Sequence, residues 1–255
     1  MKAISFFTLL ALISPLAAQN EAQPAEKTPA EAQQALMPNQ QAFLNLPEES
    51  RKEFIKHLSE ASRLFQQKRI FETMEELDKA AKIFKDSPEV YNLRGSSFVE
   101  MRAFDKALAE FNEAAKLSKD NPSIEFNIAE VYFCTKEWKK GEEQFAKILQ
   151  GIPKDNIALG RLVEFKLLLC KQKLGKTAEA ASLAEKYTFE DDSPFYYYAQ
   201  ATLSYEKKDL IKAEEWLAMA GRIFQDQNVL APWQDTLVEY GYIKSFYGED
   251  SGAAE

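Results

Sequence analysis

From about residue 47 onward, apolar side chains recur at the three- and four-residue spacing of amphipathic helices. Proline and glycine interrupt this pattern at intervals, and no segment alternates apolar and polar residues as a half-buried strand would. The pattern therefore predicts an all-α domain over residues 47–247.

The helical pattern also repeats every 34 residues, in units that start at Phe54, Pro88 and Pro122. Within each unit a small residue alternates with a large one in the same register. The eighth and eleventh places hold Ala61 and Leu64, Gly95 and Phe98, and Ala129 and Tyr132. The twentieth and twenty-fourth places hold Thr73 and Leu77, Ala107 and Phe111, and Gly141 and Phe145. Two antiparallel helices approach closely where a small side chain faces a bulky one, so each unit is predicted to be a helix-turn-helix that stacks on the next.

This unit resembles the tetratricopeptide repeat (TPR), whose pattern of small residues and aromatics it shares. The second unit matches at Tyr91, Gly95, Phe98, Phe104, Ala107, Phe111, Ala114 and Leu117. Weaker units start near residues 161 and 194. The resemblance implies a TPR solenoid, a right-handed superhelix of about five repeats. A C-terminal capping helix over 229–247, with Trp233, Leu237, Tyr240, Lys244 and Tyr247 on one face, is expected to cover the open end of the stack.

The N-terminal segment is typical of a secretory signal peptide. Lys2 precedes an apolar run from Ile4 to Ile13, and small residues end at Ala18, where cleavage is expected. The run is too short to span a bilayer, and no cysteine follows it closely, so neither a transmembrane segment nor a lipoprotein anchor is predicted. Residues 1–18 are thus assigned to the signal peptide, 19–46 to a flexible Ala/Gln/Glu/Pro-rich tether and 248–255 to a polar tail. The expected location is the periplasm or the extracellular medium.

The charge balance argues against nucleic acid as a partner. The 255 residues include 40 acidic and 32 basic ones, which gives a net charge of −8 that repels phosphate backbones and anionic lipid.

The residues needed for catalysis are largely missing. His57 is the only histidine, which excludes multi-histidine metal sites and is better explained as a partly buried structural residue. Gly175-Lys176-Thr177 imitates the end of a phosphate-binding loop, but Cys170 stands where that motif requires glycine, so a tight turn between helices is predicted instead. We therefore expect no enzyme activity, no cofactor and no metal.

Two cysteines lie on the first helices of neighbouring units. Cys134 is predicted to face the groove and Cys170 the core, as separate thiols that behave as small hydrophobes. A single disulfide between them is the alternative.

In TPR arrays the first helices of successive units line a concave face. Carrying that resemblance across predicts a partner-binding groove formed by Phe65, Asn92, Val99, Phe126, Glu130, Phe133, Phe165, Leu169, Phe195, Tyr198 and Tyr205. Large aromatic groups exposed on such a face suggest that a partner covers them. The alternative is that a drift in the repeat register, or the cap and the tether, buries several of them.

These observations favour a non-catalytic interaction scaffold outside the cytoplasm of a bacterium, which holds a partner protein or peptide in the aromatic groove. The alternative function is glycan binding, with Phe126, Phe165 and Tyr198 as stacking platforms for sugar rings.

Overall fold

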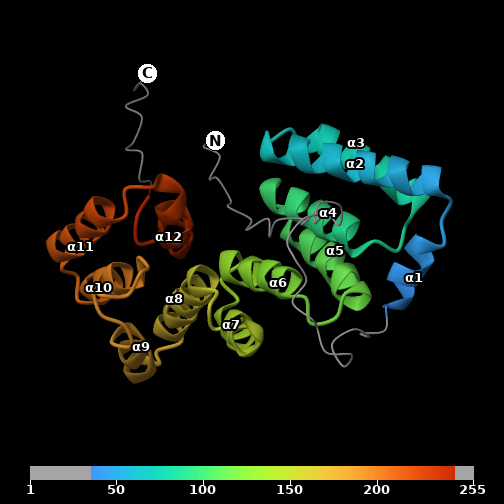
Figure 1. Ribbon diagram of the computed structural model, residues 1–255. Coiled ribbons are helices and arrows are strands. Elements are labelled where there is room, and N and C mark those ends of the chain that lie inside the picture. Colours follow the sequence, from blue (N-terminus) through green and yellow to red (C-terminus); the bar gives the residue numbers. More distant parts are fainter. Residues whose placement is uncertain (1–35, 245–255) are drawn as a thin grey trace, which may run out of the picture. The chain divides into compact units, whose positions relative to one another are not determined.

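A computed structural model describes residues 36–244, and within this range every regular element is a helix (Figure 1). The predicted signal peptide, residues 19–35 of the predicted tether and the predicted polar tail lie outside the described residues. The all-α prediction is confirmed for the described part. The chain divides into two compact units, and their described parts are residues 36–123 (the N-terminal unit) and 124–244 (the C-terminal unit).

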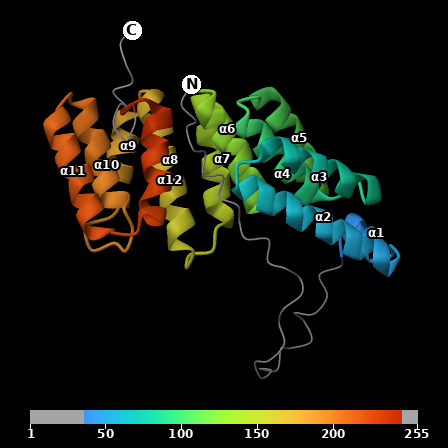
Figure 2. The ribbon, with the colours of Figure 1, turned by 90° about the horizontal axis from the view of Figure 1, so that it is seen from above.

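The helices follow one another in antiparallel pairs after a short first helix. The N-terminal unit contains α1 (Pro38–Leu44), α2 (Glu48–Gln66), α3 (Ile70–Ile83), α4 (Pro88–Glu100) and α5 (Phe104–Leu117). The helices that follow are α6 (Pro122–Cys134), α7 (Trp138–Gly151), α8 (Ile157–Lys173), α9 (Thr177–Ala184), α10 (Phe195–Glu206), α11 (Leu210–Ile223) and α12 (Gln227–Tyr240), seen from a second side in Figure 2. The pairs α2/α3 to α10/α11 correspond to the five units expected from the sequence.

The turn inside each pair has one conformation throughout. The central residue of each turn has a positive φ. These residues are Lys68, Arg102, Lys136, Gly175 and Lys208. In each turn the amides of this residue and of the next one donate to carbonyls near the end of the preceding helix, as from Lys68 to Phe65 at 2.9 Å and from Arg69 to Leu64 at 3.0 Å. These bonds satisfy carbonyl groups that the helix end leaves unpaired. Gly175 is thus the left-handed residue of such a turn (φ 71°), which explains the Gly-Lys-Thr sequence without a phosphate.

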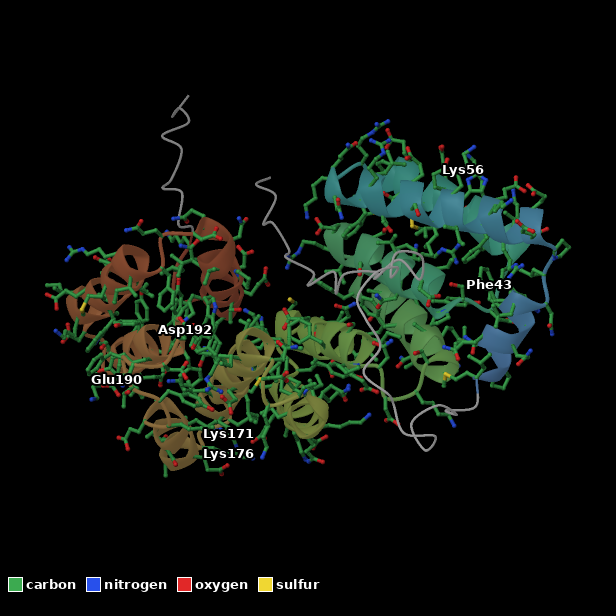
Figure 3. The ribbon with its side chains drawn as sticks, in the orientation of Figure 1. Phe43, Lys56, Lys171, Lys176, Glu190 and Asp192 are labelled. Carbon is green, nitrogen blue, oxygen red and sulfur yellow. The ribbon has the colours of Figure 1, made fainter. Side chains whose placement is uncertain are left out.

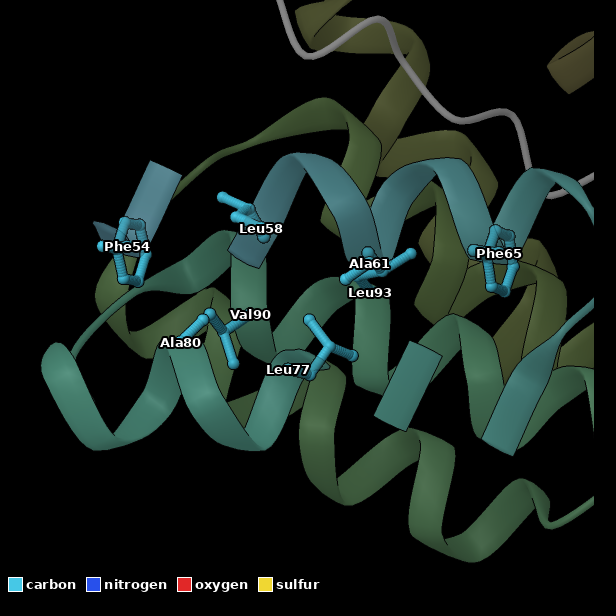
Figure 4. Close-up of a cluster of buried hydrophobic side chains, with 8 residues drawn as sticks. All are labelled: Phe54, Leu58, Ala61, Phe65, Leu77, Ala80, Val90 and Leu93. Carbon is cyan, nitrogen blue, oxygen red and sulfur yellow. The ribbon is translucent and has the colours of Figure 1, made fainter. Parts of the chain in front are cut away.

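The core inside each pair is built from the predicted contacts between small and large residues. Figure 4 shows the cluster between α2, α3 and α4, in which Ala61 and Ala80 are fully buried among larger side chains. At Gly95 the approach is closer still, because a Cβ placed there would lie 2.6 Å from the ring carbons of Phe111. The spacing of the two helices therefore depends on the absence of a side chain at position 95.

We expect Gly95→Ala to destabilise the protein by about 1–3 kcal/mol through overpacking, although alanine is the better helix former. Gly221→Ala is the matched control, because position 221 also lies in a helix but its Cβ would meet nothing within 4 Å. That control should stabilise the protein by roughly 0.5–1 kcal/mol. Urea unfolding measures both, and a stabilised Gly95→Ala variant would contradict the packing described here.

Two segments differ from the sequence prediction. Residues 38–44, assigned to the tether, form α1, because Phe43 packs its ring against Phe54 at 5.2 Å and Phe84 at 5.4 Å. The last helix ends at Tyr240 rather than 247, since Gly241 adopts a left-handed conformation (φ 97°) that terminates it. Lys244 therefore lies beyond the helix, and Tyr247 is outside the described residues.

Candidate interaction site

The first helices of the three pairs in the C-terminal unit, α6, α8 and α10, share one face, and α12 lies against it. Figures 1 and 2 show α12 beside α8 and α10. We call this surface of α6, α8 and α10 the aromatic face. Its members are the predicted groove residues Phe126, Glu130, Phe133, Phe165, Leu169, Phe195, Tyr198 and Tyr205.

The expectation that this face is exposed is wrong. Its seven apolar and aromatic members are all buried, with Tyr205 the most accessible of them at 9%. Phe126 turns toward the second helix of its own pair and meets the ring of Phe145 at 6.3 Å. Rings of the C-terminal segment lie against five of the others, as the alternative of a covering cap expects: Phe133, Phe165, Phe195, Tyr198 and Tyr205. That these residues bind a partner stays a prediction.

Trp233 of α12 fills the centre of the face. Its ring lies 5.2 Å from that of Phe165, 5.5 Å from that of Tyr198 and 6.4 Å from that of Phe195, and it is 4% exposed. Rings at these separations and at the tilted angles observed attract each other beyond the effect of area burial alone. Trp233 is therefore the principal anchor of α12.

A second aromatic group closes the end of the face near the turns. Tyr240 stacks on Phe133 at 6.3 Å and approaches Trp138 at 5.6 Å, while Lys173 places its ammonium 4.3 Å from the Tyr240 ring centre. Just beyond the helix, Tyr242 stacks on Tyr205 at 4.7 Å. The Tyr242 hydroxyl donates to Glu206 at 2.5 Å, and burial raises the pKa of that phenol.

A buried lysine and two partly buried carboxylates lie next to these aromatic groups. Lys166 of α8 is 4% exposed and donates to Glu130 of α6 at 3.0 Å, with its ammonium 4.8 Å from the Phe133 ring centre. Burial raises the pKa of the Glu130 carboxyl, Lys166 opposes this shift, and Glu239 of α12 adds to it. We call Glu130, Lys166 and Glu239 the charged cluster; its members come from α6, α8 and α12.

Both cysteines are buried free thiols, as the separate-thiol prediction has it. Burial raises the pKa of Cys134 well above its usual value, and the neighbouring Glu130 and Glu239 add to the shift. Cys134 thus lies on the α12 side of α6. Cys170 lies toward α7, with its sulfur 3.3 Å from where a Cβ on Gly141 would be, and burial raises its pKa to about 12. Neither thiol has the lowered pKa of a reactive cysteine.

Further ion pairs of this unit link α8 to neighbouring segments. Glu142 of α7 accepts bonds from Lys171 at 2.9 Å and Lys176 at 2.8 Å, two lysines labelled in Figure 3. Burial alone would raise the pKa of Glu142, but these two lysines hold it below the usual range. Arg161 donates three hydrogen bonds of 2.9–3.2 Å to the carboxylate of Asp191. Because these charges are already paired within the chain, we assign them a structural role.

The three predicted groove residues of the N-terminal unit differ among themselves. Phe65 and Val99 are buried, whereas Asn92 is partly exposed.

His57 is partly buried and bonds through Nδ1 to Glu76 at 2.6 Å, which fits the structural role predicted for it. Among residues 36–244 no three His, Cys, Asp or Glu side chains gather to hold a metal ion, and no helix is long and apolar enough to cross a membrane.

The α12 side of the site and Lys166 were not among the predicted site residues. A signal was present, because Leu230, Trp233, Leu237 and Tyr240 follow the spacing i, i+3, i+7, i+10 of a helix that docks into a groove. Only the position of that helix was misassigned. Lys166 carried no such signal, since a lysine is ordinarily exposed.

Comparisons with known proteins identify the fold. No family model matches the chain, and no curated protein matches it in sequence. Among solved structures, PilF of Pseudomonas aeruginosa superposes with a TM-score of 0.55 at 15% identity, over 76% of this chain and 97% of that one. YrrB, described as a TPR protein with an unusual peptide-binding site, gives 0.51 at 19% identity over 74% and 95%. A tetratricopeptide repeat protein of Parabacteroides merdae gives 0.51 at 12% identity over 71% and 70%.

Proposed function

Because the chain has the tetratricopeptide-repeat fold, we propose that it is a non-catalytic scaffold that binds a protein partner through a helical or peptide segment. The observation that carries the proposal is the aromatic face itself, which holds a complete amphipathic helix, α12, by four apolar anchors. A surface that holds one such helix has the shape and chemistry to hold another. The peptide-binding site described for YrrB is in keeping with this proposal but belongs to that protein.

The burial of the aromatic rings favours protein binding over glycan binding. A sugar stacks on an open aromatic face, but Phe165 and Tyr198 are at most 1% exposed and pack edge-to-face with each other at 5.9 Å. Opening this surface exposes apolar area that suits an apolar helix better than a polyhydroxylated ring.

Direct binding tests the proposal. The chain starting at Gln19 is immobilised, proteins retained from an envelope extract are identified, and each is purified and titrated against the chain. We expect at least one protein to bind saturably, and to bind equally to Phe71→Ser, a control at a ring of α3 that is 78% exposed. Binding of oligosaccharides with no protein bound would contradict the proposal.

We also propose that the chain is exported and loses residues 1–18. The support is the sequence pattern of Lys2, the apolar run and the small residues before Gln19. Intact-mass measurement of the protein recovered outside the cytoplasm should give a chain that starts near Gln19. A mass that includes Lys2 and the apolar run would reverse the proposed location.

A further inference from the structure

Helix α12 lies on the aromatic face as a ligand helix lies in a groove. Its four anchors, Leu230, Trp233, Leu237 and Tyr240, are each at most 4% exposed, and they recur at i, i+3, i+7 and i+10 on one side. Residues at its start, including Asn228 and Val229, are exposed. This is the pattern by which an amphipathic helix is recognised in a hydrophobic groove.

The interface between α12 and the array is also unlike the cores of the helix pairs. Those cores are formed by small residues against rings, as at Gly95 of α4, whose added Cβ would lie 2.6 Å from the buried ring of Phe111 in α5. Under α12, by contrast, the interface contains the charged cluster, in which Lys166 donates to Glu130 and the carboxylate of Glu239 lies near enough to add to the pKa shift of Glu130. Polar and charged contacts of this kind are typical of interfaces that open, and they offset part of the gain from apolar burial.

Features of its backbone also weaken the attachment of α12 to the array. Pro232 lies inside the helix and lacks the amide that would bond to the carbonyl one turn earlier. Only residues 224–226 connect α11 to α12. The helix is thus weakened near its start, and its hold on the array depends chiefly on the side chains of its anchors.

We propose that α12 is a self-bound ligand that a partner protein displaces. The inference rests on the proposed function and names its partner class. The partner segment is an amphipathic helix with apolar anchors at i, i+3, i+7 and i+10, aromatic at the second and fourth places. A carboxylate directly precedes the last anchor, as Glu239 precedes Tyr240. While α12 is docked, the chain competes with its own partner, so partner affinity is reduced by the fraction of molecules in which the face is open.

The experiment uses a labelled synthetic peptide of residues 227–244 as the probe and the chain from Gln19 to Glu255 as the receptor. Three receptors are compared: the unchanged chain, a released variant with Trp233→Ala and Tyr240→Ala, and a locked variant with Glu239→Cys. Cys134 lies beside Glu239, so oxidation should join the introduced thiol to Cys134 and hold α12 in place. The reduced form of the same locked variant is its matched control.

We expect the released variant to bind the peptide about 10- to 100-fold more tightly than the unchanged chain, because its own helix no longer competes. The oxidised locked variant should not bind, and reduction should restore binding. Equal binding to the oxidised and reduced forms, or no binding to a folded released variant, would overturn the inference. An unchanged chain that is dimeric while the locked chain is monomeric would show that the occupant is a second copy, which also overturns it.

If the released variant does not fold, hydrogen exchange of the unchanged chain decides. The amides of α12 should exchange at least about tenfold faster than those of α8, through an opening that leaves the array folded. Exchange of α12 only with global unfolding would overturn the inference.

The outcomes also separate this inference from the proposed function. A protein partner that binds the oxidised locked variant as well as the unchanged chain leaves the scaffold function standing and refutes displacement. Conversely, if the peptide behaves as expected but no protein binds any form, α12 is a self-bound helix that opens the face, but the proposed function fails and displacement by a partner protein fails with it.

Discussion

Replacing Trp233 by alanine is expected to lower the free energy of unfolding of the C-terminal unit by about 3–5 kcal/mol. The indole is 4% exposed and contacts the rings of Phe165, Phe195 and Tyr198 from two different helices, so its removal opens a cavity that these rings cannot jointly refill. Because α12 has few other large anchors, we expect the helix to leave the aromatic face while the helix pairs stay formed.

Two measurements check this expectation. Urea unfolding gives the loss in stability, and binding of a hydrophobic dye reports whether the aromatic face has opened. Trp216→Ala is the control, since Trp216 of α11 is partly exposed and contacts Tyr196 and Tyr197 instead of the aromatic face. It should lose less stability and bind no additional dye. A Trp233→Ala chain that unfolds in one transition and binds no dye beforehand would show that α12 belongs to the same cooperative core.

The fold was predictable because its determinants are local and periodic. Gly95 faces Phe111 sixteen residues later, and this spacing recurs from one unit to the next. A repeat array buries its core mainly between neighbours along the chain, so the period alone places each helix next to its partners. The turns follow from the same period, and even Lys136, which is not glycine, adopts the left-handed conformation that the turn requires.

The burial of the candidate site under α12 was not predictable by the same reasoning. The repeat register assigns Phe165 and Tyr198 to one face correctly, but it says nothing about a later segment that covers that face. The aromatic spacing of α12 is equally suited to capping the end of a stack and to filling a groove. The choice between them depends on contacts such as Trp233 with Phe165, 68 residues apart, for which the sequence carries no local signal.

The second large expected loss of stability concerns the charged cluster. Lys166→Met is expected to cost about 3–5 kcal/mol at pH 8, because Glu130 is left buried without its cation while Glu239 remains beside it. The pKa of Glu130 is already raised by burial, and removal of Lys166 raises it further, since the one opposing charge is lost. A carboxyl with a raised folded-state pKa is destabilising when ionised, so its cost is largest above that pKa and disappears as the group is protonated.

The loss caused by Lys166→Met should therefore shrink as the pH is lowered from 8 toward 4.5, the ordinary carboxyl value. Urea unfolding of both chains across this range measures it. Glu130→Gln combined with Lys166→Met is the control, because a neutral amide needs no cation; it should recover more than half of the loss at pH 8 and show little dependence on pH. Cys134 lies next to this cluster, but its raised pKa keeps the thiol neutral throughout this range. A loss that is the same at both ends of the range, or that the second substitution does not relieve, would show that Lys166 acts through packing of its aliphatic stem and not through its charge.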